Sequence, residues 1–309
     1  MDLLYPVKWL MEAVMVFFHT LVSIVGIDKD SGLAWVLSIV GLVLVVRAAL
    51  IPIFVKQIKS QRNMMLVQPE LQKLQKKYKG KTDRESREAM AKEQMELYKR
   101  TGSNPLSSCL PLLIQMPIFS SLFFTMNDAQ SGKPGVGLMD LTLANSFSHA
   151  QLFGAPLSAT FFNSDGFEVK ILAAVMILLM TASQFITQKQ IMAKNQNPAA
   201  QNSQYMQTQK VMLYMLPVVF AISGVSFPLG VMFYWLTSNF WTMGQQFIVI
   251  RNMPTPGSPA HAAREARLAK RGKGSAAAEP TLEELEAQKP STTQRTQPVG
   301  KNRAKKQSK

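Results

Sequence analysis

The residues of this chain that could do chemistry are one arginine and a few amides within apolar runs. The sequence contains no C-x-x-C, H-E-x-x-H, P-loop or G-x-S-x-G pattern. Its three histidines stand far apart at positions 19, 149 and 261, and Cys109 is its one cysteine. A chain so poor in nucleophiles and metal ligands predicts no enzyme, no metal site and no cofactor.

Arg47 is the only charged residue in the 22-residue run from Leu33 to Phe54. A helix of that length rises roughly 33 Å, enough to cross a bilayer core of about 30 Å. Near the centre of such a helix an arginine costs about 2.5–3.5 kcal/mol. None of the apolar runs holds an Asp or Glu to pair with it. The guanidinium either snorkels to the headgroups or faces a water-filled cavity between helices.

Amide side chains in other apolar runs favour the cavity. Gln115, Gln184 and Asn239 each lie in a different run. Single Ser or Thr residues in membrane helices commonly bond their own backbone, whereas an amide in several runs is harder to explain that way. The sequence therefore predicts a polar intramembrane site that includes these amides and Arg47.

The elements that must position these residues are apolar runs of membrane-crossing length. Hydrophobic residues make up 47% of the chain and charged residues 17%, yet the net charge is +15 because the charges are segregated. Prolines within a run are tolerated in a membrane bundle. The predicted fold is all-α, a polytopic membrane protein with a five-helix transmembrane bundle and a cytoplasmic helical hairpin. Its spans are 31–55, 105–126, 169–187, 211–227 and 231–250.

The charges between the runs predict an orientation. Thirteen Lys/Arg residues lie in 56–104 and thirteen in 251–309, whereas 127–168 holds only Lys133 against four acidic residues. Basic loops stay in the cytoplasm. We therefore expect the N-terminus and the loop 127–168 outside, and the loop 188–210 and the tail inside.

Two of the other segments allow alternatives. Segment 56–104 has apolar residues at helical spacing on either side of Gly80, which predicts a helical hairpin, although a solvated connector is also compatible. Residues 1–30 predict an amphipathic helix in the membrane interface, from Leu10, Val14, Phe17 and Leu21, and a short span is the alternative.

The tail 251–309 is rich in Pro, Ala, Ser, Lys and Arg and has no aromatic residue, which predicts disorder. Its last nine residues carry five positive charges, a density typical of segments that bind polyanions such as ribosomal RNA or acidic headgroups. A merely solubilising tail is the alternative. The five residues are Lys301, Arg303, Lys305, Lys306 and Lys309.

Three stretches of motif, in order along residues 5–250, resemble the YidC family of membrane protein insertases. The first is Val45-Val46-Arg47, followed by Pro52, Lys56-Gln57 and Gln68-Pro69. The second runs through Gly102-Ser103-Asn104-Pro105-Leu106, Cys109-Leu110-Pro111 and Gln115-Met116-Pro117-Ile118-Phe119. The third contains Phe227-Pro228-Leu229-Gly230, Tyr234-Trp235, Asn239 and Gln245-Gln246. The resemblance is to the short form common in Gram-positive bacteria.

The resemblance implies a bacterial cell-membrane protein with a hydrophilic groove open to the cytoplasm and to lipid. The family's groove arginine falls on Arg47, and Gln184 and Trp235 fall on further groove positions. It also implies nascent membrane proteins, the ribosome and the general secretion translocon as partners, within the phospholipid bilayer. An anion transporter and a purely structural scaffold are the rival functions, and internal repeats typical of the transporter are not found.

Overall fold

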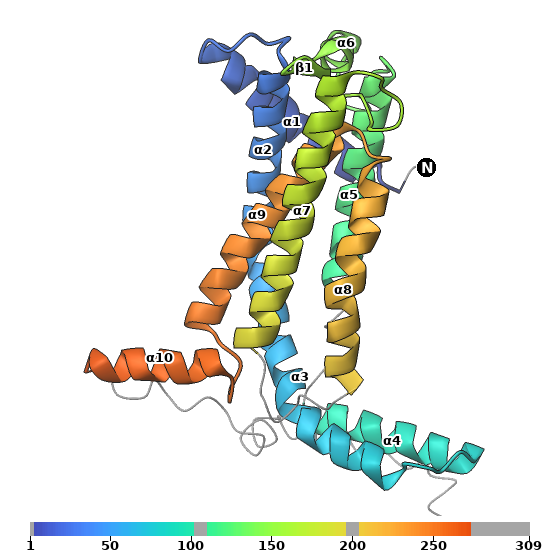
Figure 1. Cartoon of the computed structure of the whole chain (residues 1–309), viewed down its shortest axis with the longest axis vertical. Helices are drawn as coiled ribbons and strands as arrows, with labels where there is room; N and C mark the ends of the chain where they lie inside the picture. The colour runs from blue at the N-terminus through green and yellow to red at the C-terminus, as the bar shows by residue number, and fades with distance from the viewer. Residues whose placement is uncertain (1–2, 102–109, 196–203, 273–309) are drawn as a thin grey trace, which may run out of the picture.

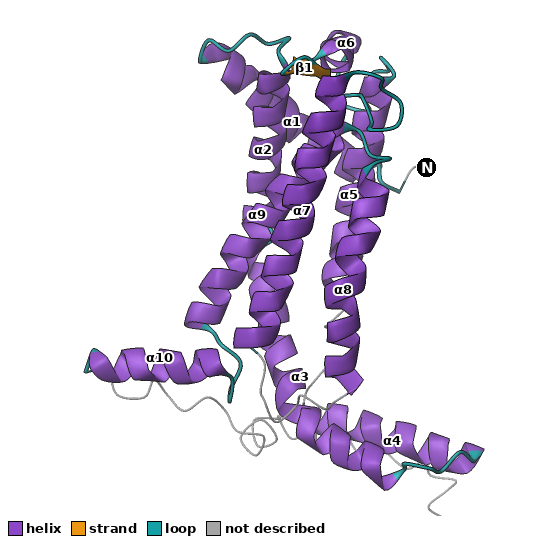
Figure 2. Ribbon diagram, in the orientation of Figure 1, coloured by secondary structure: helices purple, strands orange, loops and turns teal. Residues whose placement is uncertain are grey.

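The computed structural model describes residues 3–101, 110–195 and 204–272, and this part of the chain is almost entirely helical (Figures 1 and 2). A single antiparallel pair of two-residue strands joins β1, Gln151–Leu152, to β2, Ala155–Pro156. The helices are α1 Tyr5–Ile24, α2 Gly32–Ala49, α3 Ile51–Lys77, α4 Arg84–Thr101, α5 Leu110–Gln130, α6 Leu141–His149, α7 Phe167–Lys194, α8 Gln204–Gly224, α9 Leu229–Asn252 and α10 Pro259–Lys270.

Helices α2, α5, α7, α8 and α9 run along the long axis of the molecule, and α1 crosses them obliquely near one end (Figure 1). Helix α9 is central, because it packs on α2, α5 and α7. Buried side chains such as Trp35, Leu122 and Val231 form the core, while many large apolar side chains face outward, among them Leu178 at 69% exposure. An apolar exterior over an apolar core is what a lipid environment favours.

Of the predicted spans, those in α2 and α7 are helices long and apolar enough to cross a membrane. Helix α1 also meets this criterion, and α8 contains a shorter apolar stretch, Gln209–Gly224. Helices α5 and α9 occupy the predicted positions of the second and fifth runs. The all-helical membrane fold therefore agrees with the prediction, and the full count of five spans stays a prediction.

The first predicted span does not continue unbroken to Phe54. Helix α2 ends at Ala49, and α3 begins at Ile51 with Pro52 in its first turn. Proline lacks an N–H and its ring crowds the carbonyl four residues earlier, so it interrupts an apolar run that hydropathy alone treats as continuous. Arg47 consequently lies in the last turn of α2 and not near the centre of a longer helix. A cation is favoured there by the helix dipole.

Helix α1 is amphipathic as predicted, but its polar side faces the protein. Glu12 and His19 are buried, whereas Leu10 and Phe17 are exposed. The helix approaches α2 closely at Gly41, where an added Cβ would collide with the ring of Phe18. A helix in contact with lipid is expected to turn its polar side chains toward the protein and its apolar side chains toward the lipid. Both predicted alternatives for α1, interfacial and spanning, are compatible with this arrangement.

The loop 127–168 folds into a cap over one end of the helices (Figure 1). It contains α6 and the β1–β2 hairpin, whose turn places Phe153 and Gly154 at positive φ. The backbone N–H groups of Leu229 and Gly230 donate to the carbonyls of Ala159 and Leu157, which fastens the start of α9 to this cap. The cap thus fills the end of the helices opposite α3 and α4.

At the other end, α3 and α4 pack together as an antiparallel pair joined by residues 78–83. Their small core consists of Met64, Val67, Leu71 and Leu97.

The tail is not disordered throughout, because α10 occupies Pro259–Lys270. Ser258 caps this helix by accepting from the backbone N–H of His261, a local feature that the overall composition of the tail conceals. The prediction of disorder is therefore wrong for this stretch. The predicted polyanion-binding residues Lys301, Arg303, Lys305, Lys306 and Lys309 lie outside the described residues.

Candidate functional site on α9

The guanidinium of Arg47 reaches from α2 to α9. Its Nη2 donates to Ser238 Oγ at 2.9 Å and its Nε donates to the same oxygen at 3.3 Å. The carbon Cζ also lies 5.9 Å from the centre of the Phe54 ring, across the break between α2 and α3. The acceptor of these hydrogen bonds, the Ser238 hydroxyl, is neutral. Within the described residues no ion pair involves Arg47, so its positive charge remains uncompensated there.

Gln115 reaches α9 from α5, one helical turn from Ser238. Its Nε2 donates to the Tyr234 hydroxyl at 2.8 Å. Tyr234 and Ser238 are four residues apart, so they share one face of α9. This face receives the polar side chains of two other helices, and both Tyr234 and Ser238 are buried.

Asn239 lies on the neighbouring face of α9 and contacts α7. Its Nδ2 donates to the backbone carbonyl of Met180 at 3.4 Å. Gln184 follows Met180 by one turn on α7 and is half-buried. Asn239 therefore contacts the segment of α7 that carries Gln184. Neither amide side chain is hydrogen-bonded to Arg47.

Trp235 belongs to an aromatic cluster beside this polar face. Its ring centre lies 4.6 Å from that of Phe220 in α8, 5.6 Å from Phe119 in α5 and 5.7 Å from Phe227. These contacts are edge-on, the arrangement that aromatic rings prefer over face-to-face stacking. The predicted position therefore presents an apolar, polarizable surface instead of a polar one.

The structure thus brings Arg47 and Gln115 to one face of α9, and places Asn239 and Trp235 on the adjoining face. Ser238 and Tyr234 were not predicted as site residues, although they make the contacts that hold Arg47 and Gln115. Their spacing of four residues was visible in the sequence, yet a Ser and a Tyr in a membrane helix are too common to mark a site.

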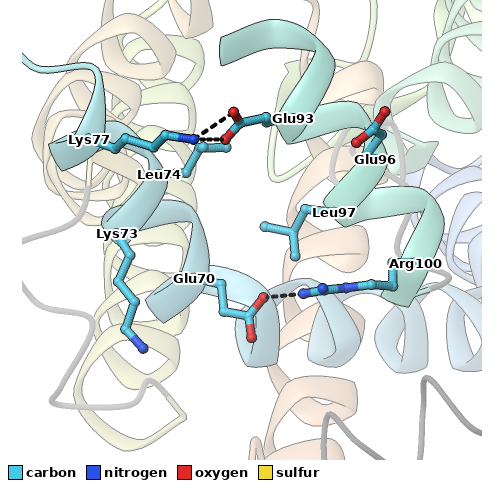
Figure 3. A pocket seen from close by; sticks show the side chains of 8 residues that line it. All are labelled: Glu70, Lys73, Leu74, Lys77, Glu93, Glu96, Leu97 and Arg100. Atoms are coloured by element: carbon cyan, nitrogen blue, oxygen red, sulfur yellow. Dashed lines mark hydrogen bonds and ion pairs between the residues drawn. The ribbon is translucent and has the colours of Figure 1, made fainter. Parts of the chain in front are cut away.

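A second polar feature is the cleft of about 540 Å³ between α3 and α4 (Figure 3). Two ion pairs bridge it: Lys77 Nζ lies 2.6 Å from Glu93 Oε1, and Arg100 Nη2 lies 2.9 Å from Glu70 Oε2. The hydrogen bonds from Lys77 and Tyr78 hold the pKa of the Glu93 carboxyl below its ordinary value. The two ion pairs join α3 to α4, and Arg47 is not among the residues that line this cleft.

No group of three His, Cys, Asp or Glu side chains in the described residues could hold a metal ion. The side chains on α9 that contact Arg47 and Gln115 offer hydrogen bonding, and Arg47 adds charge attraction.

A family model described as 60Kd inner membrane protein matches residues 26–256. The chain belongs to this family. The match confirms the resemblance predicted from the three motif stretches, and it agrees with a location in a bacterial cell membrane. It includes Arg47, Gln115, Gln184, Trp235 and Asn239.

Similar proteins carry the name membrane protein insertase YidC. One from Streptomyces avermitilis is 48% identical over 86% of this chain and 61% of its own length. One from Tropheryma whipplei is 41% identical over 98% of this chain and 96% of its own length. A third, from Bifidobacterium longum, is 38% identical over 98% of this chain and 95% of its own. The chain thus spans about three-fifths of the Streptomyces protein and nearly all of the other two.

Proposed function

We propose that this protein is a membrane protein insertase, a non-enzymatic protein that receives nascent membrane proteins and releases their hydrophobic segments into lipid. The names of its relatives support this function, and so does the polar face of α9 within an otherwise apolar set of helices. The uncompensated charge of Arg47 is the observation that carries the proposal.

An arginine whose partner is the neutral Ser238 hydroxyl retains its full attraction for an anionic group. A guanidinium is always protonated, and in a medium of low dielectric its field is weakly screened. An acidic segment of a substrate is a suitable partner, because it brings the missing negative charge and also needs polar contacts to leave water.

We place the substrate's hydrophilic outer segment in a groove lined by Arg47, Gln115, Gln184 and Asn239. These groups replace part of the water that the segment loses, and so lower the barrier to crossing the outer half of the membrane. Trp235 and its aromatic neighbours offer an adjoining surface for the hydrophobic segment. Partitioning into lipid then drives release, and no nucleotide is consumed.

The charge pattern supports an orientation with the N-terminus and the α6 cap outside, and with α3, α4 and the C-terminus in the cytoplasm. In that orientation the α3–α4 hairpin and the basic tail would receive substrate from the ribosome or from the general secretion translocon. The hairpin's two bridged helices provide a charged surface for such a contact.

The test is insertion of a single-span substrate with an acidic outer segment by Arg47→Ala and Arg47→Lys variants. A hydrogen bond to a charged group contributes about 1.5–3 kcal/mol, so the alanine variant should insert this substrate about tenfold to a hundredfold more slowly. The lysine variant should retain most of the rate. A substrate with a neutral outer segment is the control and should be nearly unaffected. Normal insertion of the acidic substrate by Arg47→Ala would refute this role of Arg47.

A further inference from the structure

The tip of the β1–β2 hairpin holds a phenylalanine in a backbone conformation that suits it poorly. The two paired strands leave only Phe153 and Gly154 as the turn between them. Both residues have positive φ, at 54° and 80°, which is the pattern of a type I′ turn. Asparagine, aspartate and glycine are favoured in such a turn, whereas a bulky side chain at positive φ is strained. The turn alone therefore does not account for a phenylalanine at position 153.

Packing within the protein does not account for Phe153 either. Leu152 and Ala155, on either side of the turn, pack against the two buried apolar clusters of the helices. Phe153 instead projects from the surface at 82% exposure. A large aromatic side chain that is both strained and exposed gains nothing from the fold, which indicates a contact outside the chain.

The hairpin lies between the ends of α2 and α7, two of the helices that are long and apolar enough to cross a membrane (Figures 1 and 2). Strand β1 packs so closely on the first residue of α2 that a Cβ added at Gly32 would collide with the Gln151 carbonyl. Strand β2 contacts α7, and a Cβ added at Gly154 would lie 3.7 Å from Glu168 Cγ, in the first turn of α7. The tip is therefore held at the level where both helices begin.

Outward apolar side chains continue from this level along both helices. Phe167, Ile171 and Val175 recur every four residues on one face of α7 and are all exposed, Phe167 at 73%. Leu33 and Leu37 repeat the pattern from the start of α2. Since the chain belongs to an inner membrane protein family and both helices are candidate spans, these two apolar stripes are suited to face lipid. The hairpin tip stands at the head of this lipid-facing surface.

We propose that Phe153 inserts into the bilayer at the boundary between headgroups and acyl chains, so that the β1–β2 hairpin anchors the cap to the lipid surface. A phenyl ring gains free energy when it leaves water for this layer, and that gain offsets the strain of the turn. Lipid is the occupant, and not a second protein, because the tip continues a surface that the membrane covers. The anchor holds the cap at a fixed height and is independent of Arg47 and of the proposed insertase function.

The first test places 4-(trifluoromethyl)phenylalanine, which keeps the aromatic ring, at position 153 of the full-length protein in lipid nanodiscs. Fluorine NMR compares relaxation by dissolved oxygen, which concentrates in the bilayer, with relaxation by a water-soluble nickel chelate. The control is the same probe at Asn145, an exposed residue of α6 at the end of the molecule (Figure 1). The ratio of oxygen to chelate effects should be at least about threefold higher at 153 than at 145. Equal ratios would overturn the proposal and leave the tip free for a protein partner.

A second test, hydrogen exchange in nanodiscs, separates a lipid anchor from a residue that serves only the turn. Phe153→Asn introduces a residue that this turn prefers, so a purely structural role predicts slower or unchanged exchange in segment 151–156. Loss of a lipid anchor predicts exchange about threefold faster or more, relative to the intrinsic rates, because the tip is no longer held. Phe153→Trp keeps an aromatic anchor and should exchange as the wild type does.

Phe162→Asn is the matched control, because it removes another exposed phenylalanine of the cap and leaves the turn intact. It should not change exchange in segment 151–156. Slower or unchanged exchange in Phe153→Asn would contradict the proposal. An equal acceleration in Phe162→Asn would also contradict it, since the effect would then not arise from the hairpin tip.

Discussion

The Ser238 hydroxyl is the acceptor that positions the guanidinium of Arg47, and it comes from a different helix. A single buried hydroxyl from α9 therefore orients the charged end of Arg47. Gln115 and Tyr234 make the same kind of contact one turn away. The site is thus built on α9, and Arg47 and Gln115 reach it from α2 and α5.

Ser238→Ala should impair insertion of an acidic substrate in the same direction as Arg47→Ala, by about fivefold to thirtyfold. Removal of the hydroxyl leaves the guanidinium without its fixed acceptor, a loss of about 1–2 kcal/mol. Ser238→Thr, which keeps a hydroxyl, should stay close to the wild type. The measurement is the insertion rate of both single variants and of the double variant. Because the two residues touch, the double variant should lose less than the two single losses combined. Simple additivity would show that Ser238 does not act through Arg47.

The sequence could indicate Arg47, Gln115 and Asn239, because a charge or an amide is rare in an apolar run. It could not indicate Ser238 as the partner of Arg47, since serine is frequent in membrane helices and no local pattern marks a contact between α2 and α9. Trp235 came from the family resemblance, and the structure adds that it lies among aromatic rings.

At the scale of elements, apolar runs located most of the helices. Three features escaped this approach. The α2–α3 break was hidden in a continuous apolar run, although Pro52 was a visible marker. Helix α1 presents its polar side inward, because lipid reverses the usual amphipathic rule. Helix α10 was not predicted, because the average composition of the tail indicates disorder and gives no sign of a local helix.

The α3–α4 pair offers an element-scale prediction, since Glu93 accepts hydrogen bonds from both Lys77 and Tyr78 of the opposite segment. Glu93→Gln should speed amide hydrogen exchange in segments 71–77 and 89–97 at neutral pH. Glu88→Gln is the matched control, because Glu88 pairs with Arg84 within α4 and does not join the two helices. Equal exchange in both variants would contradict a bridging role for Glu93.

The same contact gives the hairpin a pH dependence of known sign. The pKa of Glu93 is lowered, chiefly by the hydrogen bond from Lys77, so its stabilising contribution is present above the ordinary carboxyl value of 4.5 and is lost as the pH falls below it. The pKa of Lys77 is raised, chiefly by the hydrogen bond to Glu93, so its contribution is present below 10.5 and is lost at higher pH. Protection from exchange, relative to the intrinsic exchange rate at each pH, should therefore be greatest between about pH 5 and pH 10, and Glu93→Gln should flatten the acid side.

At the scale of the whole molecule, the two ends differ in charge. The end with α3, α4 and α10 carries the basic segments, whereas the loop 127–168 at the capped end holds Asp128, Asp140, Asp165 and Glu168 against Lys133 alone. This separation follows from a few loop sequences and could be derived without a structure. The cap itself could not, because the packing of α6 and the β hairpin depends on contacts between distant segments.

The proposed orientation predicts which positions an impermeant thiol reagent can reach. In a Cys109→Ser background, Phe162→Cys in the cap should be labelled on intact cells. Lys79→Cys, between α3 and α4, should be labelled only after the membrane is permeabilised. Both side chains are exposed, so access to the reagent depends on the side of the membrane. The reverse pattern of labelling would invert the orientation.

The central claim is that nascent membrane proteins pass along the polar and aromatic faces of α9, and its most direct test is site-specific photocrosslinking. A photoreactive residue at position 235 keeps Arg47 intact, and the same residue at Leu178, on the outward side of α7, is the control. With a ribosome-stalled single-span substrate, the account predicts strong crosslinks from position 235 and weak ones from position 178. Substrate that inserts without crosslinks from position 235, or with equal crosslinks from both positions, would contradict it.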